Sequence, residues 1–517
     1  MNISKLLPEM IYQIVAKKNR SKLRVILRTH RKLKTQGGLA RLFELQSIMA
    51  DEQFDRIKKQ ASKTMFGSSL ESASLIVRQY SYCQLIVKDR FTKAILYSIG
   101  SGKPIRCPLP VEWRNTLENE GYSVDGFTCQ LQFILLLMIY FCFGIYRAIC
   151  IFMATISSNL MSSRKLVLPF AYFHNIFNLN VPTESDFEFS ENIITWYSKW
   201  IGRNKNIKSF NHNDKKNNDI ESLNFNMHYA PITKLNLGSI KSFFLFFYWF
   251  INALSICIKD LLLFRWWTFL LFEQYVQAAA LRYGEQGVIA RDYLLHHSGV
   301  FYRPIWTYEV EKRNARVILY FYSTNNEQFK NIEGYVGPGL GWKLSSWPLI
   351  LVWDKYQAEF VKRSFYSYKV IEIVGPISLS SNHKKNININ INVKKKLSAA
   401  FFDIQPYRLS KRHPLAPSNE YINSRAAIQF LKDVYKVLDD NSIVAVYKGK
   451  KDIGHTMDKK YRNILKTLSS KNQITIDSNI SANQVIEHVD FVISMPFTST
   501  AIVAYYNHKP SIYYYPF

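Results

Sequence analysis

The sequence predicts an α/β protein with two doubly wound, Rossmann-like domains, a basic helical N-terminal region and apolar helices that associate with a membrane. Three observations lead to this prediction. From Leu397 onward, short apolar runs alternate with amphipathic segments, and a second series of apolar runs lies between residues 315 and 377. Strands that alternate with helices of this length are typical of parallel sheets covered by helices. Two long apolar blocks, 129–160 and 242–272, stand apart from both series.

The N-terminal region, residues 1–128, is predicted to be helical and basic. The chain of 517 residues carries 67 Lys and Arg against 39 Asp and Glu, a formal net charge of +28, and residues 1–41 hold eleven of the cations with Glu9 as the one acid. A surplus of this size attracts anionic lipid headgroups, phosphate-bearing substrates or nucleic acid. The segment fits either a solvated basic helix or a helix lying on anionic lipid. The sequence has no RNP, zinc-finger or helix-turn-helix pattern, so we expect no nucleic-acid partner.

The six cysteines show no metal-type spacing, and all of them lie in the first half of the chain. We therefore expect neither a disulfide framework nor a zinc site, and a reducing compartment suits this usage. The sequence predicts no metal and no other cofactor.

Both apolar blocks are shorter than clean membrane spans. The uncharged run 133–146 stops at Arg147, and the run 242–258 is followed by Lys259 and Asp260. A spanning helix needs about 20 apolar residues. We therefore predict that these helices dip into one leaflet or lie along it. Buried core helices and a true two-span hairpin are the alternatives.

The segment 397–517 is predicted to be a nucleotide-sugar-binding α/β domain. Its buried strands and helices alternate, and Ser481 with Gln484 has the spacing of a capping box. The predicted strands are 398–404, 442–448, 473–477, 490–494 and 511–515, and the helices are 420–438, 457–470, 481–489 and 498–506.

Three hydroxyl side chains, Thr498, Ser499 and Thr500, follow the strand 490–494 at the start of a helix. Ligands of doubly wound sheets bind at the carboxyl ends of the strands. Free N–H groups and the positive end of a helix dipole attract phosphate there. The alternative is that Thr498 merely caps the helix.

A basic cluster, Lys448, Lys450 and Lys451, follows the strand 442–448 and is expected at the same edge of the sheet. Lysines near a helix N-terminus would complete a phosphate site. The alternative is that all three are solvated surface lysines.

The segment 161–380 is predicted to be an acceptor-side α/β domain that carries the apolar insertion 242–272. The linker 381–396 follows it, although its alternating isoleucines also fit an edge strand. Two doubly wound domains suit a two-substrate transferase. The strands expected in this segment are 315–325, 348–354 and 369–377, with a helix at 354–363.

Several blocks in the second half of the sequence resemble a known family. The block "ISMPFTSTA…KPSIYYYP" is similar to the signature of bacterial polysaccharide-biosynthesis PFTS-motif proteins, and "YRPIWTYEVE" (302–311) and "FYSTN" (321–325) resemble accompanying blocks. The run "LVWDKYQAEFVKR…VIEIVGP" resembles the end of the acceptor domain of GT-B glycosyltransferases. The resemblance implies a GT-B-like fold and an enzyme that uses a nucleotide-activated sugar in surface-glycan assembly.

The resemblance also implies a donor site. In related sialyltransferases and Kdo transferases a Ser/Thr motif and a His-Pro motif hold the nucleotide, and the Ser/Thr element matches Thr498–Thr500. The stretch 448–455 has lysines where His-Pro is expected, and His413-Pro414 lies one element earlier. The chain stops at Phe517, directly after the last strand, so we expect either a short or a truncated donor domain.

The resulting hypothesis is an inverting, metal-independent glycosyltransferase, peripheral or monotopic on the cytoplasmic face of the bacterial inner membrane. It would move a sugar from a nucleotide-sugar donor to a glycan or lipid-linked acceptor. Lys448, Lys450 and the turn at Thr498–Thr500 would stabilise the leaving phosphate. A polyol-phosphate transferase of teichoic-acid type and a non-enzymatic membrane-bound assembly factor are the alternatives.

Glu309 is the predicted general base, and the alternative is a surface carboxylate paired with Lys312 or Arg313. Asp354 and His297 are further candidates for the base. The glycine-rich stretch 335–342 is expected to be an acceptor-side loop.

Overall fold

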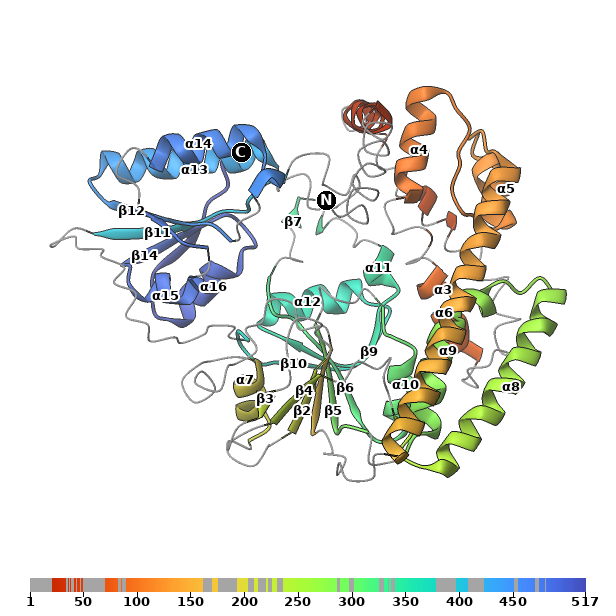
Figure 1. Ribbon diagram of the computed structural model, residues 1–517. Coiled ribbons are helices and arrows are strands. Elements are labelled where there is room, and N and C mark those ends of the chain that lie inside the picture. Colours follow the sequence, from red (N-terminus) through yellow and green to blue (C-terminus); the bar gives the residue numbers. More distant parts are fainter. Residues whose placement is uncertain are drawn as a thin grey trace, which may run out of the picture. The chain divides into compact units, whose positions relative to one another are not determined.

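In the computed structural model the chain divides into two compact units (Figure 1). One unit comprises Met1–Arg147, Phe250–Val276 and Leu409–Pro417, and the other comprises Ala148–Trp249, Gln277–Arg408 and Ser418–Phe517. The residues described are 21–33, 36, 38, 41–42, 44–46, 48–49, 70–81, 85, 90–160, 170–174, 193–202, 209–212, 220–221, 226–229, 236–285, 289–296, 302–324, 330–332, 334–335, 340–377, 397–407, 423–450, 454–469, 474–478 and 480–517.

Most of the residues that the structure describes in the N-terminal part of the first unit are helical. Residues 21–33 form a helix whose basic side chains flank a buried Ile26. The helices α3 (Leu70–Ser81), α4 (Arg90–Ser101) and α5 (Val111–Asn119) lie further along the chain.

The apolar blocks form three helices, α6 (Gly126–Leu160), α8 (Ile240–Leu262) and α9 (Trp267–Tyr283). Arg147 does not end the first block, because its guanidinium forms an ion pair with Glu273 of α9 and α6 continues through it. The second block breaks between α8 and α9, where Phe264 has a positive φ of 54° and Asp260 accepts a hydrogen bond from Thr268.

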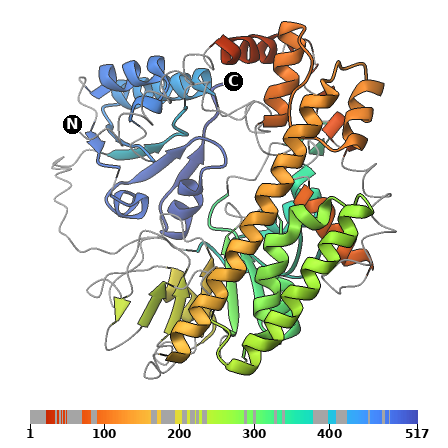
Figure 2. The ribbon, with the colours of Figure 1, turned by 45° about the vertical axis from the view of Figure 1, so that its right-hand side comes forward.

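Figures 1 and 2 show α6 running beside α8 and α9. Aromatic side chains join the three helices: Phe141 of α6 contacts Phe272 of α9, with ring centroids 4.8 Å apart, and Phe152 contacts Phe243 of α8 at 5.1 Å. Among the residues that the structure describes, two stretches are long and apolar enough to cross a membrane: Gly126–Ser157, of 32 residues, and Ile240–Leu262, of 23 residues.

The larger sheet has eight strands in the order β10-β9-β6-β5-β1-β2-β4-β3. Every pair is parallel except β3 with β4. The strands are β1 (Ala171–His174), β2 (Ser209–His212), β3 (Ile220–Glu221), β4 (Asn226–Tyr229), β5 (Asp292–His296), β6 (Arg316–Tyr320), β9 (Ser346–Val352) and β10 (Ser367–Ile373).

Helices and a small hairpin accompany this sheet, and buried tryptophans such as Trp347 and Trp353 fill its core. The added elements are α7 (Ile193–Trp200), α10 (Trp306–Lys312), α11 (Leu340–Lys343), α12 (Lys355–Ser364), β7 (Lys330–Asn331) and β8 (Gly334–Tyr335).

The smaller sheet has five parallel strands in the order β13-β12-β11-β14-β15. Alternate residues of β11 face opposite cores: Phe401 packs with α13 and α14, and Phe402 packs with α15 and α16. The elements are β11 (Ser398–Phe402), α13 (Ser424–Asp440), β12 (Val444–Lys448), α14 (Lys459–Ser469), β13 (Ile474–Ile476), α15 (Ala482–Glu487), β14 (Phe491–Ser494), α16 (Ser499–Tyr506) and β15 (Ser511–Tyr513).

The predicted strands and helices of 397–517 are thus confirmed in order and type, within a few residues at their ends. The capping box is also confirmed, because the side chains of Ser481 and Gln484 each bond to the backbone of the other. The strands expected at 315–325, 348–354 and 369–377 correspond to β6, β9 and β10, and the predicted linker 381–396 lies outside the described residues.

Candidate functional site

The smaller sheet has a switch point at its central strand. From β11 the chain moves outward through β12 and β13, then crosses over to β14 on the opposite side of β11. The carboxyl ends of the two strands on either side of such a reversal border the crevice in which ligands of doubly wound sheets bind. The segment that follows β14 therefore occupies the ligand-binding position of this sheet.

That segment is the turn from Met495 to Thr498. Phe497 adopts a positive φ of 60°, a conformation that side chains other than glycine rarely take. The hydroxyl of Thr498 donates to the carbonyl of Met495 at 2.7 Å. Thr498 therefore stands at the N-cap position of α16, but its side chain makes no capping bond to the helix.

A chain of hydrogen bonds between hydroxyl groups stabilises the turn. The oxygens of Ser494 and Thr500 lie 2.8 Å apart, and the Thr500 hydroxyl donates to the Thr498 oxygen at 3.2 Å. Because the Thr498 hydrogen continues to Met495, the hydrogens of both threonines are committed within the turn. Buried Ala501 lets the first turn of α16 pack closely.

Ser499 differs from its two neighbours. Its oxygen accepts a hydrogen bond from the backbone N–H of Thr324 at 3.2 Å, and within the described residues its own hydroxyl hydrogen is donated to no protein group. The first N–H groups of any α-helix lack intrahelical acceptors. The start of α16 therefore offers uncapped N–H groups and one hydroxyl donor to an anion.

The Thr324 contact joins two of the blocks noted in the sequence. Besides the bond to Ser499, the hydroxyl of Thr324 donates to the carbonyl of Phe497 at 3.2 Å. Thr324 is fully buried and lies shortly after β6 of the larger sheet. Thr324 thus holds the turn after β14 through two hydrogen bonds.

Lys448 lies at the carboxyl end of β12, as predicted, with only 8% of its surface exposed. Burial lowers its pKa, Lys450 lowers it further, and Asp477 acts in the opposite direction. Among the described residues its ammonium group has no hydrogen bond or ion pair. Lys450 is exposed, and Lys451 lies outside the described residues.

Asp403 is a site residue that the sequence reasoning missed. It follows β11 at the same edge, is 5% exposed, and accepts hydrogen bonds from the hydroxyls of Tyr447, at 3.2 Å, and Tyr461. Burial raises its pKa to about 6, against the lowering effect of the two tyrosines. The signal available in the sequence was a charged side chain near the carboxyl end of the apolar strand predicted at 398–404.

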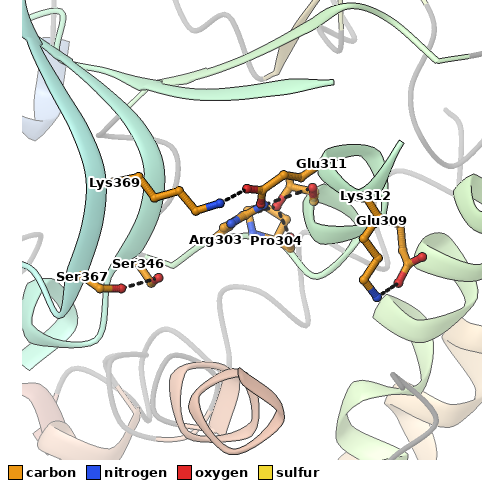
Figure 3. Close-up of polar contacts among 9 residues, drawn as sticks. Arg303, Pro304, Glu309, Glu311, Lys312, Ser346, Ser367 and Lys369 are labelled. Carbon is orange, nitrogen blue, oxygen red and sulfur yellow. Dashed lines mark hydrogen bonds and ion pairs between the residues drawn. The ribbon is translucent and has the colours of Figure 1, made fainter. Parts of the chain in front are cut away.

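The surroundings of Glu309 argue against its predicted role as a base (Figure 3). The carboxylate on α10 is 4% exposed, and Arg282 of α9 donates to both of its oxygens, at 2.8 and 3.1 Å, while Lys312 donates at 3.2 Å. Burial raises its pKa, but the combined pull of Arg282 and Lys312 outweighs burial and leaves the pKa lowered. This geometry is that of an ion pair that ties α9 to α10.

Arg313 was the alternative partner expected for Glu309, but the structure gives it another role. Its guanidinium donates to the carbonyls of Leu281 and Gly284 at the end of α9. The nearby Glu311 binds Arg303 and Lys369 instead (Figure 3).

The other residues predicted from the sequence for the site are Asp354, the two histidines His297 and His413, and the glycine-rich stretch 335–342. Asp354 caps α12 by accepting the N–H of Gln357 at 2.9 Å. His297, His413 and residues 336–339 of the glycine-rich stretch lie outside the described residues. In the described part of the chain, no three His, Cys, Asp or Glu side chains gather to hold a metal ion.

A structural comparison finds similarity to a UDP co-structure of Staphylococcus aureus MnaA, with a TM-score of 0.32 and 11% identity over 66% of this chain and 78% of the other. A similarity this weak carries no argument. No curated protein matches the chain.

A comparison with protein families is more informative. The polysaccharide biosynthesis PFTS motif proteins match residues 245–517, which is more than half of the chain and contains the turn after β14 and the whole smaller sheet. On this evidence the chain belongs to the family of polysaccharide biosynthesis PFTS motif proteins.

Proposed function

We propose that the protein is a GT-B-like glycosyltransferase that moves a sugar from a nucleotide-activated donor to a growing surface polysaccharide or lipid-linked glycan. The observation that carries the proposal is the uncapped start of α16 at the switch point of the smaller sheet, with the Ser499 hydroxyl free to donate. Membership in a polysaccharide biosynthesis family supports the choice of substrate class.

The reaction needs a group that stabilises the departing phosphate. When the bond between the anomeric carbon and the phosphate oxygen breaks, negative charge grows on that oxygen. N–H and hydroxyl donors already in place stabilise it without reorganisation, and each charge-assisted hydrogen bond contributes about 1.5–3 kcal/mol. In this proposal the α16 N–H groups and Ser499 bind the donor phosphate, while Thr498 and Thr500 hold the turn in shape.

Lys448 would approach the same phosphate group from the other side of β11. Neighbouring strands lie about 4.8 Å apart, so β12 and β14 are separated by about 10 Å. A lysine side chain and a helix N-terminus at that separation can bind a phosphate or diphosphate between them. The buried ammonium group gains an anionic partner in the process, which offsets its desolvation. Lys450 and Lys451 would add a weaker, solvent-screened attraction.

The membrane is the second proposed partner. Each of the helices α6 and α8 has one buried face and one exposed face, and the exposed face is apolar. Exposed apolar area of this extent marks an interaction surface, and lipid fits its composition. The exposed side chains are Phe127, Leu131, Ile134, Leu135, Met138, Ile139, Phe143, Tyr146, Ile149, Met153 and Ile156 on α6, and Ile240, Phe244, Leu245, Phe247, Tyr248, Ile251, Ile258, Leu261 and Leu262 on α8.

We place this surface on the cytoplasmic side of the bacterial inner membrane, where anionic lipids attract the basic segment 1–41. Alkaline carbonate washing of membranes separates a peripheral from a spanning arrangement. Release of the protein supports helices that lie in one leaflet. Full retention, together with protease access to residues 203–221 from the periplasmic side, would establish a two-span hairpin.

The function itself is tested with the purified full-length chain and a panel of CMP-, UDP- and GDP-sugars, with CDP-glycerol included. Hydrolysis or transfer from one nucleotide-sugar supports the proposal. Turnover of CDP-glycerol alone would identify a polyol-phosphate transferase that uses the same phosphate site. Absence of binding and turnover with every donor would leave a non-enzymatic assembly factor.

A further inference from the structure

Gln357, in the first turn of α12, bonds to two parts of the chain outside its own helix. Its side-chain oxygen accepts the backbone N–H of Trp353 at 2.9 Å, and its Nε2 atom donates to the carbonyl of Ser323 at 2.8 Å. The residue is 1% exposed. A buried amide whose oxygen and nitrogen both have protein partners is held in one orientation. Gln357 therefore fixes the position of the Ser323 carbonyl.

Asp354 and Gln357 have the spacing of a capping box, but the structure contains one half of it. Asp354 accepts the backbone N–H of Gln357 at 2.9 Å, as an N-cap residue does. In a complete capping box the glutamine side chain would return to the backbone N–H of Asp354. Here the amide bonds to Trp353 and Ser323 instead. A glutamate could accept from Trp353 equally well, so the Nε2 donor serves the loop after β6 and not the helix start.

The loop directly after β6 is held from the start of α12 at two carbonyls. The Phe321 carbonyl accepts the indole N–H of Trp353 at 2.6 Å. Two residues later the Ser323 carbonyl accepts the Gln357 amide, and the next residue, Thr324, is fully buried. The residues that begin α12 therefore set the path of this loop.

One peptide group connects Gln357 with the proposed phosphate site. The carbonyl of Ser323 and the N–H of Thr324 belong to the same planar trans peptide, so they point in opposite directions. The carbonyl bonds to Gln357 at 2.8 Å, and the N–H donates to the Ser499 hydroxyl oxygen at 3.2 Å. Because the group is rigid, a rotation that breaks one of these bonds also disturbs the other. All four residues lie in one unit of the chain.

We infer that Gln357 is a positioning residue for the donor phosphate, because it holds the peptide group whose N–H orients the Ser499 hydroxyl. This inference rests on the proposed function. The Ser499 oxygen accepts the Thr324 N–H, which leaves the hydroxyl hydrogen for the phosphate. Without the amide of Gln357 the peptide group can turn, and the Ser499 hydroxyl loses its fixed direction. The side chain of Thr324, which bonds to Phe497, is not part of this link.

The test uses two substitutions and a matched control in the full-length chain. Gln357→Met removes both amide groups without a change of charge, whereas Gln357→Glu keeps the acceptor for Trp353 and removes the donor to Ser323. The control, Gln429→Met, removes a glutamine side-chain bond to Asp433 of 2.7 Å within α13.

Calorimetric titration with CMP, UDP and GDP first identifies the nucleotide that binds the wild type. Both Gln357 variants should then bind this nucleotide about 3- to 10-fold more weakly, which is the loss expected when one neutral hydrogen bond no longer aligns the site. Gln429→Met should stay within about 1.5-fold of wild type. Thermal melting checks that each variant is folded at the temperature of the titration.

A double-mutant cycle with Ser499→Ala gives a readout that a purely structural role would not change. If Gln357 acts through the Ser499 hydroxyl, Gln357→Met should weaken binding by less than about twofold further in the Ser499→Ala chain. Additive losses, or folded Gln357 variants that bind as tightly as wild type, would overturn the positioning role and leave the proposed function standing. A wild type that binds none of the three nucleotides would overturn the proposed function and this role with it.

Discussion

Replacing Ser499 by alanine separates a phosphate-binding turn from a merely structural one. The change removes two things: the acceptor for the buried Thr324 N–H at 3.2 Å, and the hydroxyl hydrogen that is left for a ligand. Leaving a buried N–H unpaired costs about 1–3 kcal/mol of folding stability. Losing a charge-assisted bond to phosphate costs about 1.5–3 kcal/mol of binding, which weakens nucleotide affinity by about 10- to 150-fold.

Thr324→Val is the matched control. It removes the hydrogen bond to the Phe497 carbonyl at 3.2 Å, so it loosens the same connection without touching a group aimed at the donor. Its stability loss should be about 0.5–1.5 kcal/mol, with nucleotide affinity within threefold of wild type. Calorimetric titration with the nucleotide, beside thermal melting of both variants, gives the comparison. Unchanged affinity in folded Ser499→Ala, or equal loss in both variants, would refute the reasoning.

Three further predictions follow from the described contacts. Lys448→Met should weaken nucleotide affinity about 10- to 100-fold with little loss of melting temperature, whereas exposed Lys450→Met should change affinity less than threefold; equal effects in calorimetry would contradict this. Glu309→Gln should lower the free energy of unfolding by about 2–4 kcal/mol because Arg282 loses its partner. The transfer rate of the folded variant should stay within a few-fold of the wild-type rate. A rate that is about 10²-fold slower, with normal stability, would restore Glu309 as the base. Because the pKa of Asp403 is raised to about 6, the wild type should lose about 2 kcal/mol of stability relative to Asp403→Asn as pH rises from about 4 to 6, measured by denaturant unfolding; parallel pH profiles would contradict this.

Local signals explain why the smaller sheet could be predicted. Its buried strands are apolar runs bounded by polar residues, and the α15 capping box lies within four consecutive residues, Ser481 to Gln484. The strands β2 and β4, with the sequences "SFNH" and "NMHY", carry no comparable apolar run, so the sequence reasoning did not find them. Their pairing depends on neighbours far along the chain, which a local pattern does not record.

In the candidate site, too, local patterns predicted some features, while others depend on residues far apart in the sequence. The position of Thr498–Thr500 at a strand-to-helix turn followed from the pattern, but the direction of each hydroxyl did not, and only the structure distinguishes Ser499 from its neighbours. Arg147 interrupts the uncharged run 133–146, and its partner Glu273 could not be read from a local pattern because it lies 126 residues away. For Glu309 the sequence offered only its neighbours Lys312 and Arg313 as partners, because Arg282 is 27 residues away and pairs with it only after folding.

The central claim is that the start of α16 binds the phosphate of a nucleotide donor. A crystal structure of the full chain soaked with the nucleotide of the donor that it turns over tests this most directly. The account predicts a phosphate oxygen within about 3 Å of the Ser499 hydroxyl and of the first N–H groups of α16, with the Lys448 ammonium group turned toward the same phosphate or its neighbour. A nucleotide bound elsewhere, with the Ser499 hydroxyl and these N–H groups in contact only with water, would contradict the account.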